Sequence, residues 1–340
     1  MITLEEFLSE WRNDSPYVKV KTSGSTGEPK RMLVEKLRMR ASARITCDFL
    51  GLKAGDTALL CMSLDYIAGK MMVVRAIERN LRLIVVEPSG HPLVKQIYRE
   101  WDMRSFRPLL ASPNLGEELA AMVPMQVYNS LQVPEERERL KLIKHLIIGG
   151  GAIDEAMAEE LKAFPNQVWS TYGMTETLSH IALRRLSGPD ASEWYTPFPS
   201  VSVSLNEEGC LVIDAPEVCK ERLVTNDIAE LATNNQSFKI LGRKDNVICS
   251  GGIKIQAEEV ERMLKAHFRV PYLISKRPDR KFGEVAVLLT EGSVDEARQI
   301  CERILPKYHL PRHYLHVEHI PLTETGKPAR QLAARLAHGL

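Results

Sequence analysis

Hydrophobic and polar positions in the first two-thirds of the chain follow two alternating periods. Short β-rich apolar runs at 57–61, 82–86, 145–148 and 167–171 are separated by segments of helical period at 66–79, 92–101 and 154–163. Such alternation indicates βαβ units, whose buried strands run parallel. We therefore expect an α/β fold with a large N-terminal domain built on a mainly parallel sheet.

The pattern changes after Gly209. Short runs at 210–213, 228–231 and 238–241 are separated by turn residues without intervening helices, which predicts a small antiparallel subdomain. Beyond Asp245, a helix around 260–264, strands at 272–276 and 284–290, a helix over 294–305 and a strand near Tyr314 predict a small α+β domain of about 95 residues. We predict two domains, 1–243 and 244–340, with Asp245 as the linker.

Composition excludes several classes of protein. Apolar residues make up 44% of the 340 residues and charged residues 26%, which excludes disordered, collagenous and coiled-coil chains. A net charge of +1 offers no global field for a polyanion, so nucleic-acid binding is not expected. The acidic start lacks a signal peptide and no apolar run is long enough to span a membrane. These features predict a cytoplasmic protein without integral membrane association.

The segment Thr22–Lys30 contains the strongest candidate chemistry. It follows an alternating run at 17–21 and precedes a helical pattern over 35–50, so it is expected to be a loop after a strand. Its glycines let the backbone approach a ligand closely, and its hydroxyls, amides and Lys30 suit polyphosphate oxygens. The spacing differs from G-x-x-x-x-G-K-[ST], and a flexible surface turn explains the segment equally well.

Four further segments have residues suited to a nucleotide, each with a structural alternative. A hydroxyl and a carboxylate at Thr175-Glu176 suit a phosphate and Mg²⁺, or a helix cap. The run 148–152 leaves backbone room for a flat ring, or forms a tight turn. Asp227 suits a ribose diol, or an Asx turn. The loop 321–330 presents Lys327 between Gly and Pro, where a lysine is otherwise ordinary surface charge.

In this order, the segments resemble the adenylate-forming superfamily of acyl- and aryl-CoA ligases, luciferases and peptide-synthetase adenylation domains, over Lys21–Arg330. The resemblance implies an AMP-forming acid–thiol ligase that uses ATP, Mg²⁺, CoA and a small carboxylic acid. The catalytic residues that it implies are Lys30, Thr175, Glu176 and Lys327, with Glu176 also the Mg²⁺ ligand. The nucleotide- and CoA-binding residues that it implies are Ser23, Gly24, Ser25, Thr26, Gly27, Gly149, Gly150, Gly151, Ala152, Tyr172, Gly173, Asp227, Arg243, Gly251, Gly252 and Lys254.

The same resemblance assigns roles to these positions. Tyr172 is expected to stack on adenine, while Asp227 and Arg243 contact the ribose. The small domain is expected to be mobile and to rotate about Asp245, which withdraws Lys327 and brings the loop 250–255 to the thioester site.

Within the superfamily, compactness and the run 173–180 look most similar to the o-succinylbenzoate–CoA ligases of menaquinone biosynthesis. Candidates for holding the second carboxylate of that acid are Lys70, Ser179 and His180, and Tyr66 stands where many members have a histidine. Only 21 residues precede Thr22, so we expect uncovered sheet edges and a homodimer. The alternatives are another aryl- or acyl-CoA ligase, a stand-alone adenylation domain, or a non-catalytic nucleotide-binding remnant.

Overall fold

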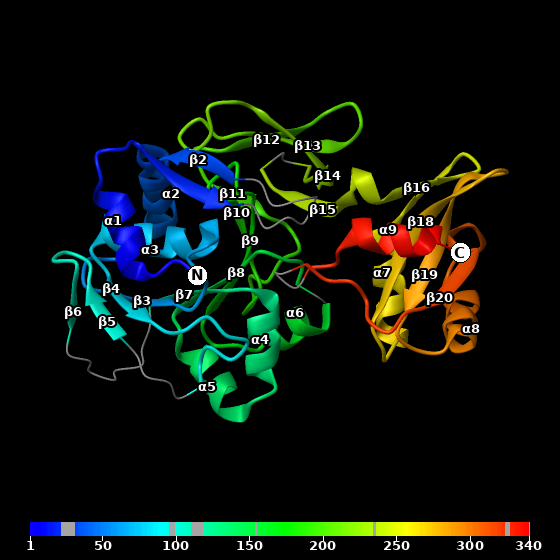
Figure 1. Ribbon diagram of the computed structural model, residues 1–340, viewed down its shortest axis with the longest axis horizontal. Coiled ribbons are helices and arrows are strands. Elements are labelled where there is room, and N and C mark those ends of the chain that lie inside the picture. The colour runs from blue at the N-terminus through cyan, green and yellow to red at the C-terminus, as the bar shows by residue number, and fades with distance from the viewer. Residues whose placement is uncertain are drawn as a thin grey trace.

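The computed structural model describes residues 1–21, 31–94, 99–109, 118–153, 155–233, 236–323 and 327–339 (Figure 1). Helix α1 (Leu4–Arg12) begins with a capping box between Thr3 and Glu6. A two-stranded antiparallel sheet follows, formed by β1 (Tyr17–Lys21) and β2 (Arg31–Glu35). The strand predicted at 17–21 is therefore confirmed, and β1 ends directly before the glycine-rich segment.

A nine-stranded sheet forms the centre of the protein, in the order β11-β10-β9-β8-β7-β3-β4-β5-β6. Its strands are β3 (Thr57–Leu60), β4 (Arg82–Val85), β5 (Arg99–Asp102), β6 (Arg107–Leu109), β7 (Leu119–Met122), β8 (His145–Ile148), β9 (Gln167–Gly173), β10 (His180–Arg185) and β11 (Thr196–Pro197). The five central strands, from β9 to β4, are parallel. Two antiparallel strands extend the sheet at each edge. The α/β class with a parallel core is as expected.

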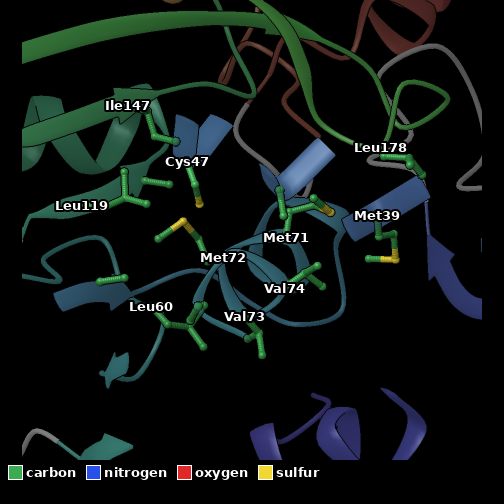
Figure 2. Close-up of a cluster of buried hydrophobic side chains, with 14 of the residues drawn as sticks. Met39, Cys47, Leu60, Met71, Met72, Val73, Val74, Leu119, Ile147 and Leu178 are labelled. Carbon is green, nitrogen blue, oxygen red and sulfur yellow. The ribbon is translucent and has the colours of Figure 1, made fainter. Parts of the chain in front are cut away.

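Helices cover both faces of this sheet. They are α2 (Lys36–Phe49), α3 (Ile67–Arg79), α4 (Pro124–Leu131), α5 (Pro134–Leu142) and α6 (Glu155–Lys162). Alternate residues of β3 enter two separate cores: Leu60 packs with α2 and α3, whereas Leu59 packs with α4, α5 and α6. Figure 2 shows the first of these cores, where Met71 and Met72 of α3 lie among side chains of the strands and of α2.

The helix predicted over 92–101 is wrong. Residues 99–102 form β5, which pairs antiparallel with β4 and β6, while residues 95–98 lie outside the described residues. Leu93, Ile97 and Trp101 are spaced as on one face of a helix. Backbone hydrogen bonds to the open edge of β4, together with burial of Trp101, outweigh that weak local pattern.

The antiparallel subdomain is confirmed as a four-stranded sheet. It contains β12 (Ser202–Leu205), β13 (Cys210–Asp214), β14 (Leu223–Leu231) and β15 (Phe238–Arg243), and every neighbouring pair is antiparallel. Strand β14 is longer than predicted because it begins at Leu223. The extension places Thr225 and Asp227 within a strand rather than in a turn, at a point where the pairing register of β14 shifts.

A five-stranded sheet follows the short 3₁₀ turn Lys244–Asn246 (Figure 1). Its elements are β16 (Val247–Ser250), β17 (Ile253–Gln256), α7 (Ala257–Leu264), β18 (Tyr272–Asp279), β19 (Gly283–Thr290), α8 (Val294–Ile304), β20 (His313–His316) and α9 (Arg330–His338), with short 3₁₀ turns at Lys265–His267 and Lys307–His309. The buried apolar clusters of this region draw on residues 248–337, and those of the preceding region on residues 4–238. The cores thus separate where the sequence predicts a linker, and motion about Asp245 stays a prediction.

Candidate functional site

Two turns lie at the carboxyl ends of the neighbouring parallel strands β8 and β9. Gly149 continues past β8, and its N–H donates to the Met122 carbonyl at 3.0 Å. A Cβ at Gly149 would lie 2.2 Å from the Thr171 hydroxyl of β9, so only glycine fits this close approach. The carboxyl edge of a parallel sheet is the usual place for a ligand. Gly150, Gly151 and Ala152 follow and face solvent.

The segment that contains Thr175 and Glu176 is a turn between β9 and β10. The buried Thr177 hydroxyl closes it by accepting from the Met174 N–H at 3.0 Å and donating to the Ser179 carbonyl at 2.8 Å. The helix cap weighed as an alternative is therefore wrong, because residues 174–179 are not helical. The Glu176 carboxylate is exposed and makes no hydrogen bond with the described residues, so it is available to a ligand.

Three predicted nucleotide-binding residues meet at the end of β9. The Tyr172 hydroxyl donates to Asp227 at 2.6 Å, and Arg243 donates to the other carboxylate oxygen of Asp227 at 2.9 Å. Asp227 and Arg243 lie directly opposite each other on β14 and β15. The antiparallel sheet thereby brings an acid and a base to the aromatic ring of Tyr172, which packs edge-on against Phe238 at 5.1 Å between centroids.

Lys327 lies 84 residues after Arg243 in the chain, yet its ammonium is near enough to Arg243 and Asp227 to interact with their charges. Its backbone is held by a hydrogen bond from its N–H to the Thr323 hydroxyl at 3.1 Å. Burial lowers the pKa of the Lys327 ammonium, the neighbouring Arg243 lowers it further, and Asp227 opposes both. Burial and Asp227 raise the pKa of the Tyr172 hydroxyl, so it stays a neutral donor. The site therefore has two cations beside one carboxylate, which suits a phosphate.

The other predicted residues either lie outside the described part of the chain or lie on a separate hairpin. Ser23, Gly24, Ser25, Thr26, Gly27 and Lys30 lie outside the described residues. Gly251, Gly252 and Lys254 lie on the exposed hairpin between β16 and β17, where the Gly251 N–H donates to the Phe282 carbonyl at 2.8 Å. This hairpin belongs to the five-stranded sheet and is separate from the Tyr172–Asp227 pair.

The residues present fit a nucleotide and its magnesium ion. The described part of the chain contains no group of three or more His, Cys, Asp or Glu side chains that could enclose a metal by themselves. Mg²⁺ bound to a nucleotide needs only one or two carboxylates, because phosphates and waters complete its octahedron. Glu176, exposed and without a hydrogen bond to the described residues, meets that requirement and would hold the ion.

The sequence reasoning missed Arg75, a fully buried arginine on α3. Its guanidinium donates to the Ser179 hydroxyl at 2.7 Å, its Nε has no partner, and no carboxylate of the described residues pairs with it. Ser179 in turn contacts His180, whose other ring nitrogen lies 3.0 Å from the Thr46 hydroxyl. Burial lowers the pKa of His180 well below its usual value, and the charge of Arg75 lowers it further. One signal was present: Arg75 interrupts the apolar run 71–76.

Lys70 belongs to the scaffold rather than to this site. Its ammonium donates to the Lys19 carbonyl at 2.5 Å and lies 3.7 Å from the Glu10 carboxylate, so α1 and β1 already satisfy it. These contacts give no support to the expectation that Lys70 holds a second carboxylate, which stays a prediction. Tyr66 precedes α3, and its ring lies 5.9 Å from the Lys21 ammonium, beside the start of the glycine-rich segment.

Comparison with known proteins identifies the class. The AMP-binding enzyme family matches residues 5–221, and the chain belongs to this family. An acyl-CoA synthetase (AMP-forming)/AMP-acid ligase II-like protein from Dyadobacter fermentans is 30% identical, with a TM-score of 0.63 over 96% of this chain and 91% of that one. The predicted superfamily is thus confirmed, together with the enzyme class of AMP-forming acid–thiol ligases and its requirement for ATP, Mg²⁺ and CoA.

More specific similarities point to one branch. The 2-succinylbenzoate–CoA ligase of Listeria monocytogenes serotype 4b is 25% identical over 333 residues, which cover 91% of this chain and 68% of that protein. The o-succinylbenzoate CoA synthetase of Bacillus subtilis, in complex with the acyl-adenylate OSB-AMP, is 22% identical and has a TM-score of 0.73, covering 93% of this chain and 68% of that one. The latter likeness establishes the fold. None of the helices in the described part of the chain has the length and apolarity needed to cross a membrane.

Proposed function

We propose that the protein activates o-succinylbenzoate with ATP and transfers the acyl group to CoA. The observation that carries this choice of acid is Arg75, a buried cation that pairs with no carboxylate of the described residues, beside the turn that contains Thr175 and Glu176. A buried charge is costly unless it is paired. The second carboxylate of a dicarboxylic substrate supplies that pair, which a simple fatty or aromatic acid does not.

The reaction has two steps. In the first, a carboxylate oxygen of the acid attacks the α-phosphorus of ATP, which forms an acyl-adenylate and releases pyrophosphate. In the second, the CoA sulfur attacks the acyl carbonyl, and the carbon–oxygen bond to AMP breaks. Mg²⁺ bound near Glu176 would neutralise phosphate charge. Lys327 and Lys30 stabilise the charge that develops on the phosphate oxygens in the first step.

The orientation of the small domain supports the first step. The Lys327 ammonium interacts electrostatically with Asp227 and Arg243, whereas the turn at Gly251 and Gly252 belongs to the separate hairpin between β16 and β17. We infer that residues 244–340 move about Asp245 between the steps, which exchanges Lys327 for this turn. The homodimer and the cytoplasmic location expected from the sequence stay predictions.

Pyrophosphate exchange into ATP, measured over a panel of acids, tests the choice of substrate. We expect Mg²⁺-dependent exchange that is fastest with o-succinylbenzoate. Exchange with fatty acids but none with aromatic dicarboxylic acids would refute the proposed substrate and favour another acyl-CoA ligase. No exchange with any acid would favour the nucleotide-binding remnant.

A lysine substitution tests the proposed division of labour. Lys327→Ala should lower exchange by roughly 100- to 1,000-fold, as loss of a preorganised charge at a developing anion does. Preformed acyl-adenylate should bypass this loss, so that thioester formation with CoA keeps its wild-type rate. Lys307→Ala, which removes an exposed lysine of the same domain, serves as the control. Equal loss of both steps in a folded Lys327→Ala protein would contradict the separate role.

A further inference from the structure

Helix α7 begins directly against the strand that contains Arg243. A Cβ at Gly242 of β15 would lie 2.3 Å from the Gln256 amide nitrogen and 2.9 Å from a Glu258 carboxylate oxygen. Both distances are shorter than a normal contact, so a larger residue at 242 would require the Gln256 and Glu258 side chains to move from the positions they hold here. The contact joins residues on opposite sides of Asp245.

Hydrogen bonds fix this contact. The Gln256 amide donates to the Arg243 carbonyl at 3.0 Å and also to Glu258. The other carboxylate oxygen of Glu258 accepts from the Asn246 amide, which belongs to the turn that follows Asp245. Glu258 therefore binds one amide on each oxygen, and both donors lie at the junction of the two regions.

Arg330 connects the same contact to the Lys327 segment. It lies three residues after Lys327, at the start of α9, and its guanidinium is 3.8 Å from Glu258. Glu261 holds Arg330 in place at 2.7 Å, and the Ile274 carbonyl accepts from it at 3.0 Å. The start of α7 thus contacts the Arg243 strand on one side and the base of the Lys327 segment on the other.

We propose that Gln256 and Glu258 are positioning residues for adenylate formation. They act as a latch between α7 and Gly242–Arg243 that holds the small domain so that Lys327 faces Asp227. This inference rests on the proposed function and deepens it, because rotation about Asp245 separates Gln256 from the Arg243 carbonyl. The latch is therefore made in the first step and broken in the second.

The test separates the two half-reactions in the full-length protein. Gln256→Ala removes the donor to the Arg243 carbonyl. Glu258→Gln replaces one carboxylate oxygen, which accepts a hydrogen bond from the Asn246 or the Gln256 amide, by an NH₂ group that cannot accept it. Each should lower o-succinylbenzoate-dependent pyrophosphate exchange by about tenfold. Transfer from preformed acyl-adenylate to CoA should stay at or above the wild-type rate. Glu259→Gln, one residue further along α7 and without a hydrogen bond or ion pair to the residues that the structure describes, should leave both rates unchanged.

Other outcomes overturn the proposal in distinguishable ways. If wild-type protein exchanges pyrophosphate and both variants exchange it equally well, the latch is refuted while the proposed function stands. Equal losses in both half-reactions, accompanied by a lower melting temperature, would show that the contact is only structural. Absence of exchange in the wild-type protein would refute the proposed function and the latch together.

Discussion

Two arginines, one in each region of the molecule, are removed from solvent in opposite ways. Arg330 of α9 forms an ion pair with Glu261 at 2.7 Å, whereas Arg75 of α3 has a serine hydroxyl and an unpartnered Nε. Burial lowers the pKa of Arg75 to about 10. Burial acts on Arg330 in the same direction, but the Glu261 carboxylate outweighs it and raises the pKa.

The difference separates a structural charge from a functional one. The Arg330 pair is complete within the chain, so its role is to hold α9 and the Lys327 segment against α7. The charge of Arg75, next to the Thr175–Glu176 turn, is not balanced by a carboxylate of the described residues. An isolated buried guanidinium lowers stability, because its desolvation is not offset. A buried guanidinium at this position is explained if a substrate carboxylate supplies the missing negative charge.

Removing the paired arginine should have the largest effect on stability. Arg330→Met leaves the partly buried Glu261 carboxylate without its ion-pair partner and should lower the free energy of unfolding by about 2 to 3 kcal/mol, measured by urea denaturation. Arg303→Met, an exposed arginine on α8, should change it by less than about 0.5 kcal/mol. The double variant Arg330→Met/Glu261→Gln should recover part of the loss. If Arg330→Met were as stable as wild type, the Arg330–Glu261 ion pair would not contribute to stability. The proposed difference between Arg330 and Arg75 would then be refuted.

Removing the unpaired arginine should cost activity rather than stability. Arg75→Met should leave the protein at least as stable as wild type, because an uncompensated charge becomes an apolar side chain. The kcat/KM for o-succinylbenzoate should fall about 100-fold, or about 2.7 kcal/mol, with little change for benzoate.

Lys70→Met is the matched control on the same helix. Its ammonium is already satisfied by Lys19 and Glu10, so this substitution should lower stability and leave the preference between the two acids unchanged. Loss of the preference in Lys70→Met, and its retention in Arg75→Met, would reverse our assignment.

The fold was predicted well where the hydrophobic period of a segment and the length of that segment indicated the same element. The alternation of strands and helices from Thr57 to Gly173 identified the parallel core, and the turn-separated runs after Gly209 identified the antiparallel sheet. The segment 92–101 failed because its strand is specified by the edge of β4, a neighbour that local spacing does not reveal.

The site was predicted unevenly for a similar reason. Asp227 and Arg243 came from ordered motifs, and the antiparallel register brings them together. Lys70 was a candidate and Arg75 was not, although both lie on α3. Five residues correspond to about 140° around a helix, so the two side chains point in different directions. Which of them faces the turn at Ser179 is decided by how α3 packs on the sheet, and this is not evident from the helix alone.

A third basic group, His145 at the start of β8, is also buried and can be compared with Arg75 and Arg330. Its removal should have the smallest effect of the three on stability at neutral pH. Neither ring nitrogen makes a well-formed hydrogen bond with the described residues. Burial lowers the pKa of the imidazole to about 4, Lys144 and Arg185 lower it further, and Gln167 and Asp56 oppose this shift. Unlike arginine, an imidazole can lose its proton at neutral pH, so His145 needs no ligand there.

His145 should instead make folding sensitive to acid. A folded-state pKa below the unfolded value of about 6.5 means that its stabilising contribution is complete above pH 6.5 and is lost progressively as the pH falls toward 4. Between pH 7 and pH 5, wild type should lose roughly 2 kcal/mol of unfolding free energy through this group. In His145→Phe the unfolding free energy should fall by roughly 2 kcal/mol less over this pH range, whereas in Arg75→Met it should fall as in wild type. If the free energy of unfolding of wild type and His145→Phe fell in parallel between pH 7 and pH 5, His145 would not be buried as a neutral base. The contrast between a neutral His145 and a charged Arg75 would then be refuted.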